Sequence, residues 1–460
     1  MAGRELFKHQ KAAIERCLNV PACLVCRAPG TGKTLIALEI IKHKMALGGT
    51  RYLWVSPASI IPQSLAVAKA EGLPAREAGE GVSGDGCVFV SYEYLRLHLG
   101  EFLRGRWDSV ICDEFHRVKN SRTQSNAALW QLRKAARTFY AFTGTPFQNT
   151  PYEFFEQVSL TAGKDLSWQC EKTLRYKRPA VSFWHNLLRR LGLSRARLNQ
   201  GPIIGVKDPA ALRQAVAEYV DFLPEESYRE ECHLPNVVMH FDRVSMSAAE
   251  LGEYRLALRG FRKKKYREFL NDDLSDSDTE SCFNGLMSLR RSLLLPGSSK
   301  ISRCVAHVCE LAGESERRTL VFCNFVEHGL AHLSRRLEQA GIAFASYDGT
   351  VSAGVRKKLL VNYQSGNIPL LLLSPVGFEG LDLYGTTDII VLDPHYNPDR
   401  TRQLVSRAIR AYSRVRTLNV HHYIAVTGSE KILSVDEKIL AIAERKKRVA
   451  GMIEACLTDN

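Results

Sequence analysis

A short glycine-rich stretch constrains this chain more than any other feature. It runs Ala28-Pro29-Gly30-Thr31-Gly32-Lys33-Thr34, directly after an apolar run and directly before a helical pattern. Gly30 and Gly32 let backbone N–H groups turn toward phosphate oxygens, and the following helix adds the positive end of its dipole. Lys33 can reach the β- and γ-phosphates of a nucleotide, and the Thr34 hydroxyl can bind Mg²⁺. The stretch, Thr31 included, therefore predicts a nucleotide-binding loop.

This loop departs from the strict Walker A pattern in one place. The full pattern has a glycine five residues before its last glycine, where this chain has Arg27. The match is therefore to the shorter G-x-G-K-T form. A glycine-rich turn that only caps a helix is the alternative, and the strand before it and the helix after it argue against that alternative.

An acidic pair supplies the second half of the predicted site. The apolar run 109–112 ends in Asp113 and Glu114. The carboxyl ends of strands are where open parallel sheets bind ligands. We expect Asp113 to hold Mg²⁺ and Glu114 to orient and deprotonate an attacking water. An isolated Asp-Glu pair would say little, but this one follows the glycine-rich loop in the order that a nucleotide site requires.

Short apolar runs that alternate with helical stretches predict the fold class. In the first half we expect strands at 22–26, 52–55, 87–90, 109–112 and 138–142, with a helix at 34–45. From about 152 to 234 no strand is convincing and basic helical segments such as 184–197 dominate. Strands return at 319–323, 343–346, 370–373, 388–392 and 421–426. Such alternation is typical of an α/β protein with two parallel sheets, each covered by helices on both faces.

These patterns divide the chain into five parts. We expect a first lobe at 1–160, a helical insertion at 161–235, and a return strand with middle helices at 236–297. The last of these contains a basic cluster at 261–267, read either as a solvated helix face or as a phosphate-contacting surface, and an acidic, Ser-rich segment at 271–281 that we predict to be a mobile loop. A second lobe follows at 298–430 and a terminal helix at 431–460.

Charge and cysteine content bound the class of protein. Lys and Arg number 63 against 49 Asp and Glu, a formal net charge of +14, which favours a polyanionic partner such as nucleic acid. Cys23 and Cys26 form a CxxC, but no second pair stands at zinc-site spacing, so we read them as reduced core thiols. No apolar run is long enough to span a bilayer, and residues 1–10 do not resemble a secretory signal. We expect an intracellular protein with no membrane partner.

Two longer motifs carry a family resemblance. The stretch 113–120, DEFHRVKN, resembles the DEGHRLKN motif of Swi/Snf-type ATPases in helicase superfamily two. The stretch 142–149, FTGTPFQN, is similar to that family's LTGTPIQN. The resemblance covers nearly the whole chain and implies two RecA-like lobes with helical insertions between them. It further implies that Thr143 and Thr145 couple the nucleotide site to DNA.

Other family motifs follow in order and imply further site residues. Leu6 to Gln10 resembles the leading LxPYQ element, whose glutamine reads the adenine edge, here Gln10. Segments with Ser56 and Pro57, and with Ser91 and Tyr92, look like those that contact a DNA backbone. In the second half, residues 377–383, GFEGLDL, resemble GGLGLNL, and residues 403–413 resemble QAxxRAHRIGQ. The implied contributions of the second lobe are Gly380, Asp382, Arg407 and Arg410.

The two arginines have a physical role of their own in this scheme. Arg407 and Arg410 lie three residues apart on a predicted helix, so both face one way. From the second lobe they could reach the γ-phosphate and stabilise the charge that develops on it, as arginine fingers do. Two solvated helix arginines are the alternative, which the motif context disfavours.

Two departures narrow the resemblance. The histidine and glutamine of RAHRIGQ are Ile409 and Ser413 here, which is closer to the Swi/Snf-like ATPases of large DNA viruses. The family's basic RRTK stretch is absent, and residues 219–222, YVDF, stand near its place. A nucleosome-directed role is therefore less favoured.

The sequence thus predicts an ATP- and Mg²⁺-dependent translocase on double-stranded DNA, with transcription or chromatin proteins as further partners. An RNA-directed helicase of the same superfamily and a non-catalytic scaffold are the alternatives. No sequence-reading module and no strand-separating wedge is identifiable, so we expect sequence-independent movement rather than unwinding. Residues 445–448, RKKR, are either an import signal or part of an amphipathic helix, and we favour the nucleus over the cytoplasm.

Overall fold

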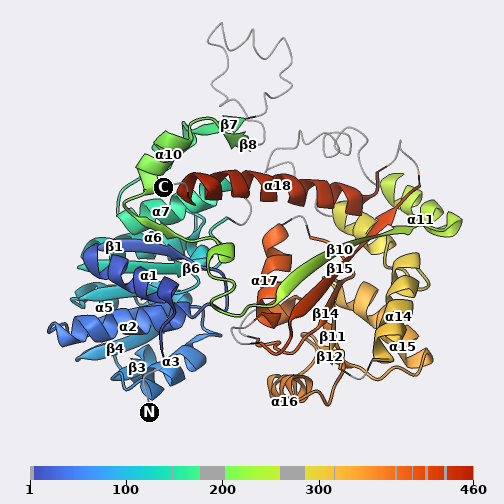
Figure 1. Ribbon diagram of the computed structural model, residues 1–460, viewed down its shortest axis with the longest axis horizontal. Coiled ribbons are helices and arrows are strands. Elements are labelled where there is room, and N and C mark those ends of the chain that lie inside the picture. Colours follow the sequence, from blue (N-terminus) through green and yellow to red (C-terminus); the bar gives the residue numbers. More distant parts are fainter. Residues whose placement is uncertain are drawn as a thin grey trace, which may run out of the picture.

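The computed structural model describes residues 5–147, 150–176, 203–259, 285–314, 316–378, 381–395, 397–409, 413–428 and 433–458. The predicted basic helix at 184–197, the basic cluster at 261–267 and the acidic loop at 271–281 lie outside these residues. The described residues form two α/β lobes side by side, joined by a long C-terminal helix (Figure 1).

The first lobe is built on a seven-stranded parallel sheet in the order β3-β4-β2-β5-β6-β1-β9. Its strands are β1 (Ala22–Cys26), β2 (Arg51–Ser56), β3 (Ala75–Glu77), β4 (Gly86–Ser91), β5 (Ser109–Cys112), β6 (Thr138–Thr143) and β9 (Val220–Phe222). The helices are α1 (Lys8–Asn19), α2 (Lys33–Ala46), α3 (Ile61–Ala70), α4 (Tyr92–Leu97), α5 (Leu99–Arg104), α6 (Gln124–Ala135) and α7 (Pro151–Ala162).

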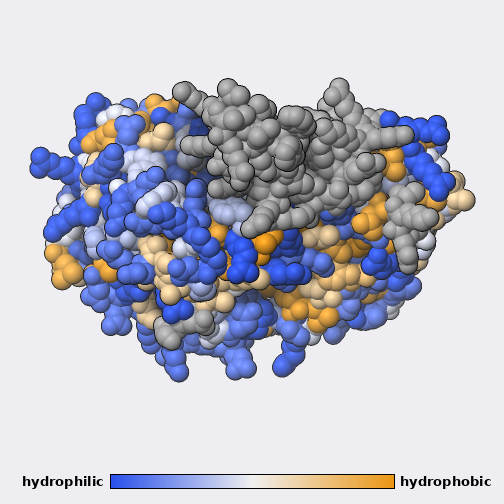
Figure 2. Space-filling view, turned by 90° about the horizontal axis from the view of Figure 1, so that it is seen from above, coloured by the Kyte–Doolittle hydropathy of each residue, from blue (hydrophilic) through white to orange (hydrophobic). Residues whose placement is uncertain are grey.

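Helices cover both faces of this sheet because its strands are apolar on both sides. Along β2, Leu53 and Val55 belong to one core, whereas Tyr52 and Trp54 belong to the other. This is the burial expected of a parallel sheet between two helical layers. The surface seen from above is mostly hydrophilic where residues are described, with scattered apolar patches (Figure 2).

The second lobe contains a six-stranded parallel sheet in the order β10-β15-β14-β11-β13-β12. Its strands are β10 (Asn236–Ser245), β11 (Thr319–Phe322), β12 (Ala345–Tyr347), β13 (Leu370–Leu373), β14 (Asp388–Val391) and β15 (Thr417–Val426). The helices are α11 (Ala248–Arg259), α14 (Ser299–Ala312), α15 (Ala331–Gln339), α16 (Ala353–Gln364) and α17 (Pro398–Ala408), with a further helix over residues 285–292. The predicted fold class is therefore confirmed.

The predicted helical insertion between the lobes is wrong in one respect. Where no strand was expected, the structure has β7 (Leu174–Tyr176), β8 (Ile203–Val206) and β9, alongside α8 (Ser167–Glu171) and α10 (Pro209–Val216). β9 pairs in parallel with β1 and completes the first sheet. β7 and β8 form a small antiparallel pair. Each strand has three or four residues, too few to give an alternation that a sequence reading can detect.

The C-terminal helix, α18 (Val435–Thr458), packs on both lobes (Figure 1). Its first turns, with Val435 and Ile439, belong to an apolar cluster of the second lobe. Its last turns, with Val449, Ile453 and Cys456, belong to a core of the first lobe. The sequence predicted this helix but not that it would connect the two lobes.

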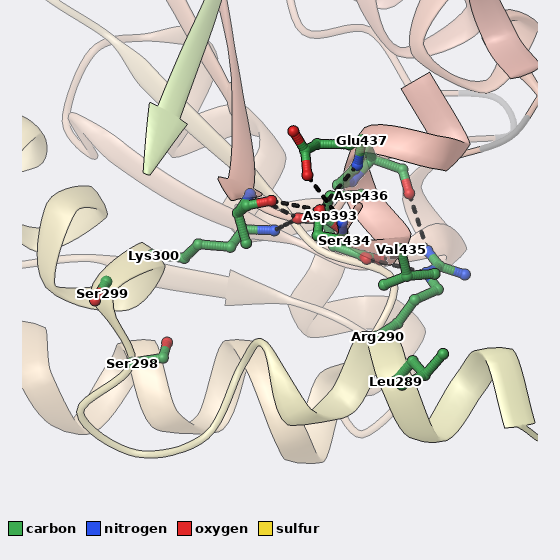
Figure 3. Close-up of polar contacts among 12 residues, drawn as sticks. Leu289, Arg290, Ser298, Ser299, Lys300, Asp393, Ser434, Val435, Asp436 and Glu437 are labelled. Atoms are coloured by element: carbon green, nitrogen blue, oxygen red, sulfur yellow. Dashed lines mark hydrogen bonds and ion pairs between the residues drawn. The ribbon is translucent and has the colours of Figure 1, made fainter. Parts of the chain in front are cut away.

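Buried polar contacts fix the start of α18 to the second lobe (Figure 3). Lys300 forms an ion pair of 2.7 Å with Asp436, and both side chains are almost fully buried. The same carboxylate accepts a hydrogen bond from the backbone N–H of Ala425 at 3.0 Å. Ser434 caps the helix by accepting from the N–H of Glu437 at 3.0 Å. Because these groups are buried and paired, the first turn of α18 is held firmly.

Candidate nucleotide site

The glycine-rich loop lies between β1 and α2, as predicted. Gly30 and Gly32 adopt φ values of 81° and 84°, a conformation that favours glycine. The Nζ atom of Lys33 lies 3.2 Å from the carbonyl oxygen of Arg27 and 3.3 Å from that of Ala28. Burial lowers the pKa of Lys33, and the carboxylates of the acidic pair oppose that shift. The loop therefore curls around a nearly buried ammonium group that is available to a phosphate.

Gln10, at the start of α1, packs against this loop. Its Nε2 donates to the carbonyl oxygen of Thr31 at 2.9 Å, and its Oε1 accepts from the N–H of Phe7 at 3.0 Å. A Cβ atom at Gly32 would stand 2.4 Å from that Nε2 atom. The second glycine is therefore required for the close approach of Gln10 as well as for its φ. The Thr31 hydroxyl donates to the carbonyl oxygen of Ala28 at 2.7 Å, and the Thr34 side chain is half-buried.

Asp113 and Glu114 lie at the carboxyl end of β5. An Asp113 carboxylate oxygen accepts from the N–H of Glu114 at 2.9 Å. Burial and the neighbouring Glu114 charge raise the pKa of Asp113 to about 6. Burial alone would raise the pKa of Glu114 too, but the nearby basic groups outweigh it and the pKa is lowered. Asp113 is thus suited to binding a cation, and Glu114 stays ionised.

Glu114 also has an unusual backbone. Its φ of 49° lies in the left-handed region, where few residues other than glycine are found. Such strain costs of order 1–3 kcal/mol and is concentrated at functional sites. The conformation directs the chain into the short 3₁₀ segment η2 (Phe115–Val118). The position of the acidic side chain is therefore imposed by the surrounding fold.

Thr143 connects the acidic motif to the glycine-rich loop. Its Oγ1 lies 3.5 Å from Nδ1 of His116, and its carbonyl oxygen accepts from the N–H of Arg27 at 3.2 Å. The N–H of Thr145 donates to the same Oγ1 at 3.2 Å. Between them, a Cβ atom at Gly144 would stand 2.8 Å from Pro29 Cγ and 3.2 Å from Lys33 Nζ. The loop after β6 therefore touches both halves of the site.

The second lobe contributes Arg407, from the last turn of α17. Its positive charge lowers the pKa values of Lys33 and Glu114 and opposes the rise at Asp113. Its carbonyl oxygen accepts from the N–H of Leu383 at 2.9 Å, next to the half-buried Asp382. The structure thus brings Arg407 toward the site of the first lobe. Gly380 and Arg410 lie outside the described residues.

The segments expected to face DNA are largely buried. The side chains of Ser56, Pro57 and Tyr92 are buried, and Ser91 is half-buried. The Tyr92 hydroxyl donates to the carbonyl oxygen of Asp113 at 2.7 Å, so this residue supports the acidic motif. Ser91 caps α4 by accepting from the N–H of Tyr94 at 3.0 Å. Contact of these four residues with DNA stays a prediction.

Sequence reasoning missed a group of residues that contact the start of the glycine-rich loop and lie far from it in the sequence. Arg27 forms an ion pair with Asp221 at 2.7 Å, and the Tyr228 hydroxyl accepts from the N–H of Ala28 at 2.8 Å. The signals in the sequence were two departures from the family pattern: Arg27 at a Walker A glycine position, and Asp221 in the YVDF stretch near the place of the missing RRTK. The two thiols read as core residues, Cys23 and Cys26, are buried and unbridged, as predicted.

Among the described residues there is no group of three or more His, Cys, Asp or Glu side chains arranged to hold a metal ion. Nor does any helix within the described ranges have the length and hydropathy to cross a membrane.

Family profiles match this chain in three segments. Residues 80–297 match the SNF2-related domain, and residues 300–412 match the helicase conserved C-terminal domain. Residues 4–148 match the res subunit of type III restriction enzymes. The acidic motif 113–120 and the stretch 142–149 fall within the SNF2-related match. Arg407 falls within the helicase C-terminal match.

Similar proteins and structures cover most of the chain. A protein of Acanthamoeba polyphaga mimivirus, described as a putative ATP-dependent RNA helicase, is 23% identical over 96% of this chain and 94% of its own length. The human DNA repair and recombination protein RAD54-like is 24% identical over 80% of this chain and 50% of its length. Arabidopsis thaliana CHROMATIN REMODELING 25 is 22% identical over 96% and 54%. The chain thus spans about half the length of these two cellular relatives.

A solved structure of the Sulfolobus solfataricus SWI2/SNF2 ATPase core in complex with double-stranded DNA covers 98% of this chain and 93% of its own. It has 16% sequence identity and a TM-score of 0.42.

The two parallel sheets, the glycine-rich loop and the acidic pair Asp113-Glu114 define a two-lobed P-loop ATPase. Together with the SNF2-related and helicase C-terminal matches, they make this chain a Swi/Snf-like ATPase of helicase superfamily two, a nucleic-acid-dependent ATPase.

Proposed function

We propose that this chain is an ATP-dependent translocase on double-stranded DNA. The observation that carries the proposal is the division of the nucleotide site between the lobes. Lys33, Asp113 and Glu114 come from the first lobe, and the charge of Arg407 from the second lobe acts on all three. A site divided in this way links ATP turnover to the relative movement of the lobes.

The geometry suggests what each side chain does. Lys33 leaves the two loop carbonyls that now surround it and binds the β- and γ-phosphates. Glu114, held ionised, orients the attacking water and accepts its proton. Arg407 stabilises the charge that develops on the transferred phosphoryl group. Arg410 is proposed to act with it.

The donor set fits Mg²⁺. The Asp113 carboxylate is nearly buried, its pKa is raised, and it lies within the electrostatic reach of Lys33, the neighbour of Thr34 in the chain. Oxygen donors of this kind are those that Mg²⁺ prefers, and few of them are needed because the ion keeps waters and binds phosphates. Mg²⁺ held there with ATP would neutralise phosphate charge.

Movement follows from differential affinity. ATP favours the closed arrangement because only there does its γ-phosphate meet Arg407, and hydrolysis removes that preference. Thr143 and Thr145 touch both the acidic motif and the loop, so they are placed to pass the change on. Gln10, Gly380 and Asp382 complete the nucleotide pocket in this scheme. Alternate closing and opening would advance the lobes along DNA phosphates without reading sequence.

Two considerations support duplex DNA as the track. The chain carries a net charge of +14. Two of its relatives are named for DNA repair and recombination or for chromatin remodelling. We further propose a nuclear role in repair, transcription or chromatin remodelling, or a related role in viral transcription. Ser91 and its neighbours on the first lobe remain candidate DNA contacts.

A steady-state ATPase assay with duplex DNA, single-stranded DNA and RNA at equal nucleotide concentration tests the proposal. We expect the largest stimulation with duplex DNA and a loss of stimulation as salt rises. Displacement of a third strand from a DNA triplex then reports movement, and the Lys33→Ala chain is the inactive control. Stimulation by RNA alone would contradict the proposal.

RNA-directed helicase activity is the second candidate function. It is favoured by the mimivirus protein, which is described as a putative ATP-dependent RNA helicase and matches this chain nearly end to end. The same three-substrate comparison separates the candidates. A non-catalytic scaffold is disfavoured because Lys33, Asp113 and Glu114 are all in place.

A further inference from the structure

Two departures from the family pattern meet in the structure. Arg27 stands where the Walker A pattern has glycine, and Asp221 belongs to the YVDF stretch near the place of the missing RRTK. An Nη atom of Arg27 lies 2.7 Å from the Asp221 carboxylate, and the arginine side chain is 2% exposed. The other Nη atom donates to the carbonyl oxygens of Cys26 and Asp221 at 3.0 and 2.9 Å.

A second contact comes from the same segment of the chain. Tyr228, 1% exposed, accepts a hydrogen bond from the backbone N–H of Ala28 at 2.8 Å. Its ring stacks on His9 with 4.7 Å between centroids. The 3₁₀ segment η3 (Glu225–Ser227) immediately precedes it, and Cys232 closes the small apolar cluster beneath Ala28.

These contacts act on the two residues that hold the catalytic lysine. The carbonyl oxygens of Arg27 and Ala28 accept hydrogen bonds from Lys33 Nζ at 3.2 and 3.3 Å. Asp221 fixes the side chain of Arg27, and Tyr228 fixes the backbone of Ala28. Since a peptide unit is planar, holding the Ala28 N–H also orients the Arg27 carbonyl bonded to it.

We propose that Asp221 and Tyr228 are positioning residues for the nucleotide-binding loop, acting through Arg27 and Ala28. They set the orientation of the loop before ATP arrives, and so determine ATP affinity rather than the rate of the chemical step. The inference rests on the ATP-binding part of the proposed function and not on its nucleic-acid part.

The Tyr228→Phe chain tests the second contact by removing one hydroxyl while keeping the stacked ring. Because a single hydrogen bond contributes about 1 kcal/mol, we expect the Kd of a fluorescent, non-hydrolysable ATP analogue to rise about fivefold. We also expect the KM for ATP to rise similarly and kcat to stay within about twofold. Binding is measured without nucleic acid, so failure of translocation does not affect the result. Lys33→Ala shows that the analogue reports on this loop.

Tyr219→Phe is the matched control, since Tyr219 lies in the same segment but its ring contacts Lys164 instead. We expect no change in ATP affinity for this variant. Unchanged affinity in Tyr228→Phe, or an equal loss in both variants, would overturn the proposal.

The charge pair has its own test. Asp221→Asn leaves the buried Arg27 without its anion, and we expect weaker ATP binding. Adding Arg27→Gly, which restores the Walker A glycine, should bring affinity back to within about twofold of the unchanged chain because the uncompensated charge is gone. If the losses of ATP affinity in Arg27→Gly and Asp221→Asn simply add up in the double variant, the pairing of the two residues is contradicted. If Asp221→Asn does not fold, the double variant and Arg27→Gly alone still give the comparison.

Discussion

Lys300 and Asp436 form an ion pair of 2.7 Å whose side chains are 2% and 1% exposed. It joins the first turn of α14 to the first turn of α18 within the second lobe. The rest of α18 then crosses to the first lobe, where Val449 and Ile453 are buried. A helix that contacts both lobes limits how far they can separate, so this ion pair fixes one end of that connection.

Breaking this pair is expected to destabilise the protein strongly. Asp436→Ala leaves a buried ammonium group without its partner, a change that typically costs about 3–5 kcal/mol. Urea unfolding followed by circular dichroism measures the loss. The control is Glu310→Ala, which breaks the exposed Arg303–Glu310 pair and should cost no more than about 1 kcal/mol. If the free energy of unfolding fell equally in the two variants, burial would not make the Lys300–Asp436 pair more important than the exposed one.

Glu114→Gln is expected to separate ATP binding from hydrolysis. The amide preserves the shape of the side chain but cannot accept a proton from water, so kcat should fall by about 10²–10⁴-fold. ATP affinity should change little because Lys33 and the loop are intact. A rapid-quench assay alongside nucleotide binding measures both quantities. Undiminished hydrolysis would remove Glu114 from the role of base.

Buried histidines predict a loss of stability in mild acid. Burial, reinforced by the neighbouring His421, lowers the pKa of His422 from 6.5 to about 4. As pH falls from about 6.5 to about 4, the unfolded chain binds a proton that the folded chain does not, so the free energy of unfolding decreases. The shift corresponds to roughly 3 kcal/mol at most, complete near pH 4.

Unfolding measured at several pH values checks this expectation. His422→Phe should flatten the dependence between pH 6.5 and 4, because the buried imidazole is gone. An identical slope in the unchanged and His422→Phe chains would show that another group is responsible.

Much of the fold could be predicted because its strands are strongly apolar. The strands β1, β5 and β13 have the predicted bounds, and most others differ by one or two residues. β3 and β9 could not be predicted, since three residues with polar members give no periodicity and are held by pairing with β4 and β1. The bridging role of α18 was equally invisible, because it depends on which distant residues pack against Val449 and Ile453.

The candidate site, too, could be predicted from the sequence only in part. Local motifs identified Lys33, Asp113 and Glu114, which the structure brings together. The contacts of Arg27 with Asp221 and of Ala28 with Tyr228 join residues about 200 positions apart, so no local pattern could reveal them. Burial of Ser56 and Tyr92 was also hidden, because a motif match does not say which of its side chains faces solvent.

The claim that one nucleotide site is shared by both lobes is tested most directly by single-turnover hydrolysis in the Arg407→Ala chain. Arg402→Ala is the control, because Arg402 lies on the same helix but is 42% exposed and faces Glu454. We expect hydrolysis in Arg407→Ala to slow by about 10³-fold or more at saturating ATP, with the control unaffected. A hydrolysis rate in Arg407→Ala within about tenfold of the unchanged chain would contradict the account.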